Sequence, residues 1–295
     1  MDVAEGSEAR VDVPIRIRLR FGRAAAQIVA DQVGVDLLHI KGDAVDPSLR
    51  QAEASGSDVD VMVRPSHVEL LDPALRAHGW QLYSTFQYGS PFGHAQTYLH
   101  DHWGYLDVHR SFPGIRLNPE AAFDRLWGAR TTVDVTGVAC PVPDVLAQSV
   151  LLLLNAARDG GTRGVGLRSI WYEAPDDRRA EISKLVAAFD AEVAFAAAVG
   201  DLDRYRRRRE YLLWKVSSQG GTRFEEWWGR VRAEQTVGGA VRTLARAPLV
   251  NVDRLTHSLG RRPTGGEILR EFFARPVRAT RQTIDQWNRR RTAGS

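Results

Sequence analysis

The segment that most constrains the fold is Gly56–Val63, which reads Gly-Ser-Asp-Val-Asp-Val-Met-Val. Its three valines alternate with Asp58, Asp60 and Met62, which is the period of a β-strand. Two carboxylates two residues apart on a strand project from one face, while the valines face a core on the other. Two such anions repel each other unless a cation lies between them. The segment therefore predicts a strand that presents two aspartates to a hard cation such as Mg²⁺, which binds carboxylates and substrate phosphates.

A third acid lies in Gly104–His109, where Leu106 and Val108 alternate with Asp107 and His109. If this strand is a neighbour of Gly56–Val63, Asp107 completes a three-carboxylate cluster. Such a cluster can hold two metal ions roughly 3.5–4 Å apart. An isolated Asp-x-Asp pair is most often a surface feature, but the strand alternation and the second aspartate-bearing strand favour a catalytic site.

Hydrophobic periodicity predicts a mixed β-sheet carrying helices in the first half of the chain. The expected elements are a helix over 15–34, a strand over 35–41, a helix or irregular segment over 43–53, the strand over 57–63, a helix from Pro65, and strands over 80–86, 95–100 and 104–109. A helix over 119–128 and a strand or hairpin over 131–141 follow. Beyond them we expect helices over 145–158, 178–198, 202–217, 224–247 and 264–291.

This pattern predicts an α+β fold with a boundary near residue 142. Residues 1–142 would form the sheet domain and residues 143–295 a mainly helical domain that binds the acceptor or nucleotide. Cys140 is the single cysteine, so no internal disulfide is possible and a reducing compartment is expected. The acidic N-terminus does not resemble a secretory signal, and the longest apolar run, near Val150–Leu154, is too short to span a bilayer. We expect a cytoplasmic protein without a membrane partner.

Charge is distributed unevenly along the chain. From Arg242 to the end there are twelve arginines against four acids, a balance of +8, so the first 241 residues sum to −4 within the overall +4. A basic region can attract a phosphate-bearing polymer such as RNA. The simpler interpretation is a solvated, arginine-rich surface, and both interpretations stay open at this point.

Three stretches together resemble the nucleotidyltransferase superfamily related to DNA polymerase β. They are Ile40-Lys41-Gly42, the strand with Asp58 and Asp60, and the strand with Asp107 and His109. The resemblance is closest to a branch of uncharacterised bacterial nucleotidyltransferases and covers roughly residues 15–175. In that branch a strand ending in Lys-Gly precedes the Asp-x-Asp strand, and the third aspartate lies in a short strand followed by histidine.

The resemblance implies a role for each matching position. Asp58, Asp60 and Asp107 would be the catalytic metal ligands, and Asp107 would also help to activate the acceptor hydroxyl. Lys41 and Gly42 would begin the nucleotide-binding turn, and His109 would lie beside the site.

This chain departs from the family pattern at Asp43, where a second Gly or a Ser is usual. Two loops therefore compete for the triphosphate. The first is the turn after Lys41, and the second is the loop before the Asp-x-Asp strand, with the N–H groups of Gly56 and Ser57.

The expected function is Mg²⁺-dependent transfer (Mn²⁺ being a possible substitute) of a nucleoside monophosphate from an NTP such as ATP. The acceptor would be a hydroxyl or phosphate of a small molecule, a peptide or protein, or RNA, and pyrophosphate would leave. The alternative is a non-catalytic nucleotide- or nucleic-acid-binding protein on the same scaffold. Retention of three mutually repelling carboxylates favours the enzyme. The sequence leaves the acceptor, the preferred NTP and the oligomeric state open.

Four histidines fall within sixteen positions and invite a separate explanation: His94, His100, His102 and His109. His100-x-His102 has the spacing to chelate zinc, but no nearby cysteine or third ligand supports such a site. The histidines would otherwise lie beside the acceptor or triphosphate, or simply be half-exposed strand residues.

Overall fold

The computed structural model describes residues 13–50, 56–87, 92–158, 160, 167–246, 263–267, 269–270 and 274. The expected helix over 264–291 lies mostly outside these residues. Among the described helices, none combines the length and the apolar character needed to cross a membrane.

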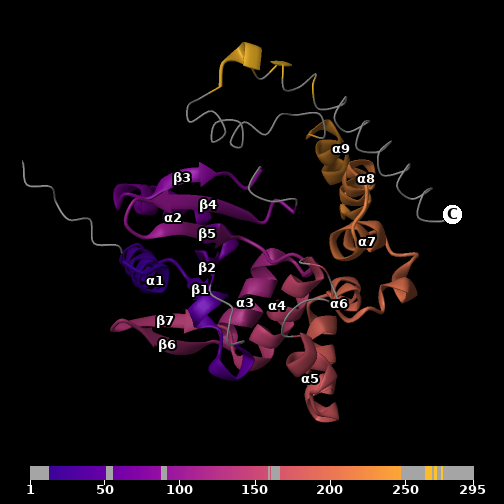
Figure 1. Ribbon diagram of the computed structural model, residues 1–295, viewed down its shortest axis with the longest axis horizontal. Coiled ribbons are helices and arrows are strands. Elements are labelled where there is room, and N and C mark those ends of the chain that lie inside the picture. The colour runs from indigo at the N-terminus through magenta and orange to yellow at the C-terminus, as the bar shows by residue number, and fades with distance from the viewer. Residues whose placement is uncertain are drawn as a thin grey trace, which may run out of the picture.

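The centre of the molecule is a five-stranded mixed sheet, which confirms the α+β prediction (Figure 1). Its strands are β1 (Leu37–His39), β2 (Asp58–Val63), β3 (Gln81–Ser84), β4 (Ala95–His100) and β5 (Gly104–His109). They run in the order β1-β2-β5-β4-β3. The β2–β5 pair is parallel and the other pairs are antiparallel. The two aspartate-bearing strands are therefore direct neighbours at the middle of the sheet.

Both faces of β2 are buried in apolar cores, because helices cover both sides of this part of the sheet. Val59, Val61 and Val63 pack into a core with side chains from α1 (Ile15–Gln32) and α2 (Val68–Ala77). On the opposite face, Met62 is fully buried with residues of α3 (Pro119–Gly128) and α4 (Val145–Arg158). The core predicted for the valines is therefore present. Asp58 and Asp60 lie on the other face of β2, which also carries an apolar core around Met62.

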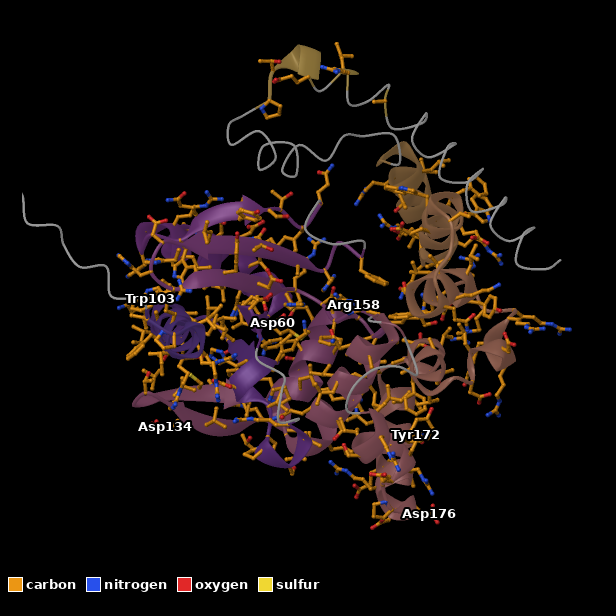
Figure 2. All side chains as sticks on the ribbon, viewed as in Figure 1. Asp60, Trp103, Asp134, Arg158, Tyr172 and Asp176 are labelled. Carbon is orange, nitrogen blue, oxygen red and sulfur yellow. The ribbon has the colours of Figure 1, made fainter. Side chains whose placement is uncertain are left out.

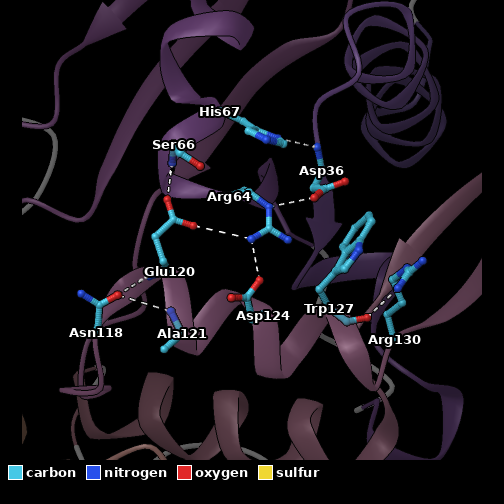
Figure 3. Close-up of polar contacts among 10 residues, drawn as sticks. All are labelled: Asp36, Arg64, Ser66, His67, Asn118, Glu120, Ala121, Asp124, Trp127 and Arg130. Carbon is cyan, nitrogen blue, oxygen red and sulfur yellow. Dashed lines mark hydrogen bonds and ion pairs between the residues drawn. The ribbon is translucent and has the colours of Figure 1, made fainter.

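Arg64, the residue after β2, fixes α3 to the end of the sheet (Figure 3). Its guanidinium contacts Asp36 before β1 and Asp124 on α3, at 2.8 and 2.5 Å. Glu120 of α3 lies 3.6 Å from Arg64 and accepts a hydrogen bond from the Ser66 backbone N–H. Networks of this kind contribute more than isolated surface pairs. The end of β2 distant from Asp58 is thereby anchored to the helical layer.

The segment over 131–141 is a hairpin of β6 (Thr131–Val135) and β7 (Val138–Val142), which packs beside β1 and α1 (Figure 1). Thr136 and Gly137 both have positive φ, as a two-residue hairpin turn requires. Between β1 and β2, the expected helical or irregular segment over 43–53 begins with two short 3₁₀ turns, Gly42–Ala44 and Pro47–Leu49.

The helical part is more interrupted than predicted. The single helix expected over 178–198 is wrong: α5 (Asp176–Ala188) and α6 (Glu192–Val199) are separated at Asp190, whose φ is +48°. Single helices over 202–217 and 224–247 are also wrong. The first is a 3₁₀ turn, Leu202–Tyr205, followed by α7 (Tyr211–Gln219), and the second is α8 (Arg223–Ala233) followed by α9 (Val237–Arg246). In the break between the 3₁₀ turn and α7, Arg206 forms an ion pair with Asp203 of the 3₁₀ turn.

One apolar core continues from the sheet into the helices. Leu38 and Ile40 belong to the same buried cluster as α4 residues and Trp214 of α7. Gln148 of α4 also accepts a hydrogen bond from the Asp46 backbone N–H at 2.7 Å. The helical region thus supports the loop that leads to β2. The division into domains 1–142 and 143–295 stays a prediction, and the shared core crosses it.

Candidate active site

The β2–β5 register places the three expected carboxylates on one face of the sheet. Asp60 pairs with Asp107, and Asp58 pairs with Tyr105, so side chains in these positions point the same way. In the whole molecule Asp60 lies between the sheet and the helical layer (Figure 2). The parallel pairing therefore produces the juxtaposition that the sequence could only suggest.

Asp60 is the buried anchor of this group, with only 6% of its surface exposed. Its Oδ1 accepts a hydrogen bond from Lys41 Nζ at 2.7 Å and lies 3.0 Å from His109 Nε2. Burial alone would raise the pKa of the Asp60 carboxyl, but the hydrogen bond from His109 and the charge of Lys41 outweigh it. The pKa is held below its ordinary value, and Asp60 is a permanent anion.

Asp58 and Asp107 are only partly buried, and both carry raised pKa values. Burial, and then the charges of Asp60 and Asp107, raise the pKa of Asp58 to about 6. Burial also raises the pKa of Asp107, against a hydrogen bond from Thr97 Oγ1 at 2.6 Å and with the charge of Asp60. The three carboxylates therefore carry more negative charge than the nearby Lys41 can neutralise. A divalent cation bound between them would reduce their repulsion.

A metal ion also has donor atoms within reach of one another. One ligand atom each from Asp60, Asp107 and His109 lies within 4.8 Å of the others, so this group can hold a metal ion. His109, expected beside the site, is thus in direct contact with it. Asp58, expected as a metal ligand, stands at the more open edge of the same face and is not part of that compact group.

The turn after β1 is held by a buried arginine that sequence reasoning missed. Arg23 on α1 is 2% exposed, and its Nη2 donates a hydrogen bond to the Lys41 carbonyl oxygen at 2.9 Å. Gly42 follows with φ +62°, and a Cβ there would lie 3.2 Å from the same Nη2. One signal was available, because Arg23 stands four residues after Leu19 and three before Ala26, on the apolar stripe of its helix.

Arg50 closes the other side of this loop. Its guanidinium donates to the carbonyl oxygens of Asp43 and Val45, each at 2.6 Å. Asp43, which departs from the family pattern, thus contributes a backbone contact to the loop.

The second candidate loop reaches the site directly before Asp58. Gly56 is partly buried and Ser57 is exposed, and Ser57 Oγ lies 3.4 Å from Asp58 Oδ1. The preceding residues 51–55 lie outside the described structure. Nucleotide binding by Lys41, Gly42, Gly56 and Ser57 stays a prediction.

The four histidines separate into two pairs. His94 is buried beside the site, with its ring 4.9 Å from that of His109. Burial, and then the charges of His109 and Arg158, lower the pKa of His94 to about 2, so it is neutral. His100 and His102 lie beside Trp103, well away from Asp60 (Figure 2). In the described part of the chain they belong to no group of three metal-ligating side chains.

Comparison with known proteins gives a family match over the sheet and the first helices after it. Residues 34–172 match the model of a family described as uncharacterised nucleotidyltransferase. That range contains Lys41, Asp58, Asp60 and Asp107. No match was found among curated protein sequences.

Three solved structures share distant similarity with the chain. The lincosamide antibiotic adenylyltransferase LnuA, in a lincomycin-bound crystal structure, is 18% identical, with 55% of this chain and 92% of that chain covered and a TM-score of 0.33. The antibiotic-resistance factor ANT(2'')-Ia is 13% identical, with 66% and 96% covered and a TM-score of 0.37. An antigenic nucleotidyltransferase-like protein from Paracoccidioides brasiliensis is 16% identical, with 62% and 94% covered and a TM-score of 0.37.

Proposed function

We propose that this chain, whose residues 34–172 match a nucleotidyltransferase family, is a Mg²⁺-dependent enzyme that transfers a nucleoside monophosphate from an NTP to an acceptor hydroxyl or phosphate. Mn²⁺ is a possible substitute for Mg²⁺. The observation that carries the proposal is the convergence of Asp58, Asp60 and Asp107 on one face of adjacent parallel strands. We further propose that the protein acts in the cytoplasm, where NTPs are available.

The donor set fits a hard divalent cation. Asp58, Asp60 and Asp107 offer oxygen ligands, and the pKa of Asp58 is raised to about 6 by burial and then by the negative charges of Asp60 and Asp107. When bound, Mg²⁺ would neutralise this charge and stabilise the negative charge that builds on the phosphate oxygens during transfer.

Each carboxylate has a distinct task in this proposal. Asp60 stays ionised because His109 and Lys41 contact it, so it would hold the metal ion throughout the catalytic cycle. Asp107, whose pKa is raised, orients the acceptor hydroxyl and takes its proton. The acceptor oxygen then forms a bond to the α-phosphorus while the bond from that phosphorus to the bridging oxygen breaks. Pyrophosphate leaves with the electron pair, and no covalent enzyme intermediate is required.

The nucleotide would approach the Lys41–Gly42 turn, which Arg23 holds in place. Lys41 Nζ adds a positive charge beside Asp60, where the triphosphate oxygens require stabilisation. Gly56 and Ser57 offer backbone N–H groups from the other side of Asp58. We propose that the helical region after residue 142, which supports this loop through Gln148, completes the binding site for the nucleotide or the acceptor.

The decisive experiment incubates the protein with each α-labelled NTP, Mg²⁺ or Mn²⁺ and fractionated cell extract, and then locates the label. Transfer of label with release of pyrophosphate is expected, and EDTA should abolish it. Asp58→Ala and Asp60→Ala should lose transfer while staying folded, whereas Asp176→Ala, at a side chain that is 92% exposed on α5, should keep it. Full activity in either site variant would overturn the assignment.

The rival function, a non-catalytic nucleotide-binding protein, predicts a different result. Such a protein would be stabilised against thermal unfolding by NTP with Mg²⁺ but would transfer no label under any of these conditions. The two measurements together separate the enzyme from the binding protein.

A further inference from the structure

The edge strand β3 contains an irregularity that changes which residues face the catalytic side. Leu82 pairs with Tyr98 and Ser84 pairs with Thr97, so Tyr83 is an extra residue between two consecutive partners on β4. Leu82 packs toward the core formed with α1 and α2. Ser84 shares the face of Thr97, which contacts Asp107. Such a bulge places two successive side chains, Tyr83 and Ser84, on the catalytic face, and bulges commonly redirect side chains near active sites.

Tyr83 meets a second tyrosine on that face. Its ring centroid lies 5.1 Å from that of Tyr105, and the rings are inclined at 75° in an edge-to-face arrangement. Tyr105 is the register partner of Asp58 on the neighbouring strand. The tyrosine pair therefore stands on the same face as the three carboxylates and beside the most accessible of them.

The pair is open to solvent although it consists of large aromatic side chains. Tyr105 is 37% exposed and Tyr83 is partly buried. Two inclined aromatic rings with an exposed surface offer an apolar wall for a ring of similar size, and their hydroxyls offer polar contacts at its edge. The exposed ring surface lies next to the position where an acceptor must place its hydroxyl group, since Asp58 and Asp107 flank it.

The charge on this face restricts what can bind there. The strand residues that share the face are Leu38, Asp58, Asp60, Met62, Gln81, Tyr83, Ser84, Ala95, Thr97, Leu99, Tyr105, Asp107 and His109. None of these described residues is Lys or Arg, which are the side chains that bind the phosphates of a nucleic acid. The charged members are all carboxylates, and Lys41, which reaches this face from the turn after β1, is paired with Asp60 at 2.7 Å. Aromatic faces also attract cations.

We infer that Tyr83 and Tyr105 form the acceptor subsite, and that the acceptor is a small hydroxylated ring compound that is neutral or cationic. Its ring packs against the exposed surface of Tyr105 and brings a hydroxyl at its edge to Asp107. This inference rests on the proposed function and narrows its acceptor to one chemical class.

The test uses the full-length protein, an α-labelled NTP that it accepts, and two fractions of one bacterial lysate. The first fraction contains the dialysable small molecules and the second contains total RNA. Wild-type protein should label a compound in the dialysable fraction. Tyr83→Ala and Tyr105→Ala should raise the amount of that fraction needed for half-maximal rate by roughly tenfold, with the KM for the NTP unchanged. Tyr105→Phe, which keeps the ring but loses the hydroxyl, should raise that amount less than Tyr105→Ala does.

Tyr172→Ala is the matched control, because Tyr172 is 49% exposed and lies far from Asp60 (Figure 2). Label on RNA alone would overturn the inference and leave the proposed function standing. The same result would follow if both alanine variants remained folded by circular dichroism and used the dialysable acceptor as well as wild type does. Label on protein alone, tested with the protein fraction of the same lysate, would likewise overturn only the inference. Absence of label in all three fractions would contradict the proposed function itself, and the inference with it.

Discussion

Asp60 and Asp107 lie directly opposite each other on the parallel strands β2 and β5, yet their surroundings differ. Asp60 contacts the Lys41 ammonium and the His109 ring, and its pKa lies below the ordinary value. Asp107 accepts a hydrogen bond from the neutral Thr97 hydroxyl, and its pKa is raised. Two carboxylates whose environments move their pKa values apart are suited to different tasks. Asp60 is the fixed anion, and Asp107 is the group able to exchange a proton.

This difference predicts that asparagine substitutions at the two positions have different kinetic consequences. Asp107→Asn should lower kcat by roughly 10²–10⁴, the usual contribution of a general base, while lowering the affinity for Mg²⁺-NTP less than Asp60→Asn does, since asparagine keeps one oxygen ligand. Asp60→Asn should lose both nucleotide transfer and Mg²⁺-dependent NTP binding. Isothermal titration with a non-hydrolysable NTP analogue, alongside steady-state rates, separates the two effects. Equal loss of NTP affinity in both variants would contradict the division of roles.

Removing the charge of Asp58 should increase the free energy of unfolding at neutral and higher pH. Its pKa is raised to about 6, so the folded chain holds this proton more tightly than the unfolded chain does. Stability therefore falls as pH rises from the ordinary aspartate pKa to about 6, and the loss is complete above that. After allowance for solvent screening of a partly exposed group, the loss is about 1–2 kcal/mol. Asp58→Asn should recover that amount at about pH 8 without divalent ions, and little at about pH 4.

Urea unfolding in EDTA at the two pH values measures the Asp58 effect. Saturating Mg²⁺ should then favour the wild-type protein, since a ligand that binds only the folded state stabilises it by mass action. A wild-type protein that is more stable than Asp58→Asn at about pH 8 in EDTA would show that the carboxylates do not repel one another as described.

Gly42 and Gly137 both have positive φ, so an alanine substitution at Gly137 is a control for the same substitution at Gly42. Gly42→Ala must adopt φ near +62° and bring its Cβ to 3.2 Å from Arg23 Nη2. Gly137→Ala, in the β6–β7 turn, faces a similar φ of +84° but has open space around the added Cβ. Both substitutions should cost roughly 1–2 kcal/mol of stability, because L-residues disfavour this region. Only Gly42→Ala should also raise the KM for the NTP, since it alone disturbs the turn beside Lys41.

Steady-state kinetics at saturating acceptor, together with thermal unfolding of both variants, measures this pair. If Gly42→Ala and Gly137→Ala lose the same stability and have the same KM for the NTP, the Lys41–Gly42 turn does not bind the nucleotide. In that case Gly56 and Ser57 would be the remaining candidates for the triphosphate.

The strand pattern was sufficient to predict the two aspartate-bearing strands and the faces of their side chains, but it left open whether the strands are neighbours. Alternation with period two is strict in both aspartate-bearing strands, and a one-residue slip would bury the wrong side chains, so sequence specifies the register strongly. The side chains that hold the site in place were not predictable in the same way. Arg23 meets the Lys41 carbonyl across 18 positions, and Thr97 meets Asp107 across 10. The place of Arg23 on the apolar stripe of its helix indicates burial, but the partners in both contacts depend on tertiary packing and cannot be read from periodicity.

The helix boundaries could not be predicted from the sequence, because local propensity indicates longer helices than form. The segment over 178–198 is rich in alanine and predicts one continuous helix, because alanine has the highest helix propensity. The break comes from Asp190, which adopts a left-handed conformation and lies within ion-pair distance of Arg116 and Arg208. Tertiary contacts with distant residues override the local preference, so the sequence of the segment alone does not reveal the break.

Thr97 should act on the reaction through the Asp107 carboxylate. Its hydroxyl donates to Asp107 Oδ1 at 2.6 Å, and a hydrogen bond to the charged form lowers the carboxyl pKa against the raising effect of burial. Thr97→Val has nearly the same shape but cannot donate, so the pKa of Asp107 should rise further. A larger fraction of Asp107 is then protonated at any given pH and cannot accept the acceptor proton. The acidic limb of the kcat profile should move to higher pH, and kcat at neutral pH should fall by roughly tenfold, in line with the loss of a hydrogen bond to a charged group.

Thr97→Ser separates this effect from a change in packing at β4. Serine keeps the hydroxyl donor but loses the methyl group, so the acidic limb should stay where it is in the wild type, even if stability falls slightly. Thr97→Val should conversely keep its stability and shift the limb. The pH dependence of kcat for the three proteins, measured with saturating NTP and Mg²⁺, decides between the two explanations. A limb that moves in the serine variant and not in the valine variant would mean that Thr97 positions β4 and has no influence on the protonation of Asp107.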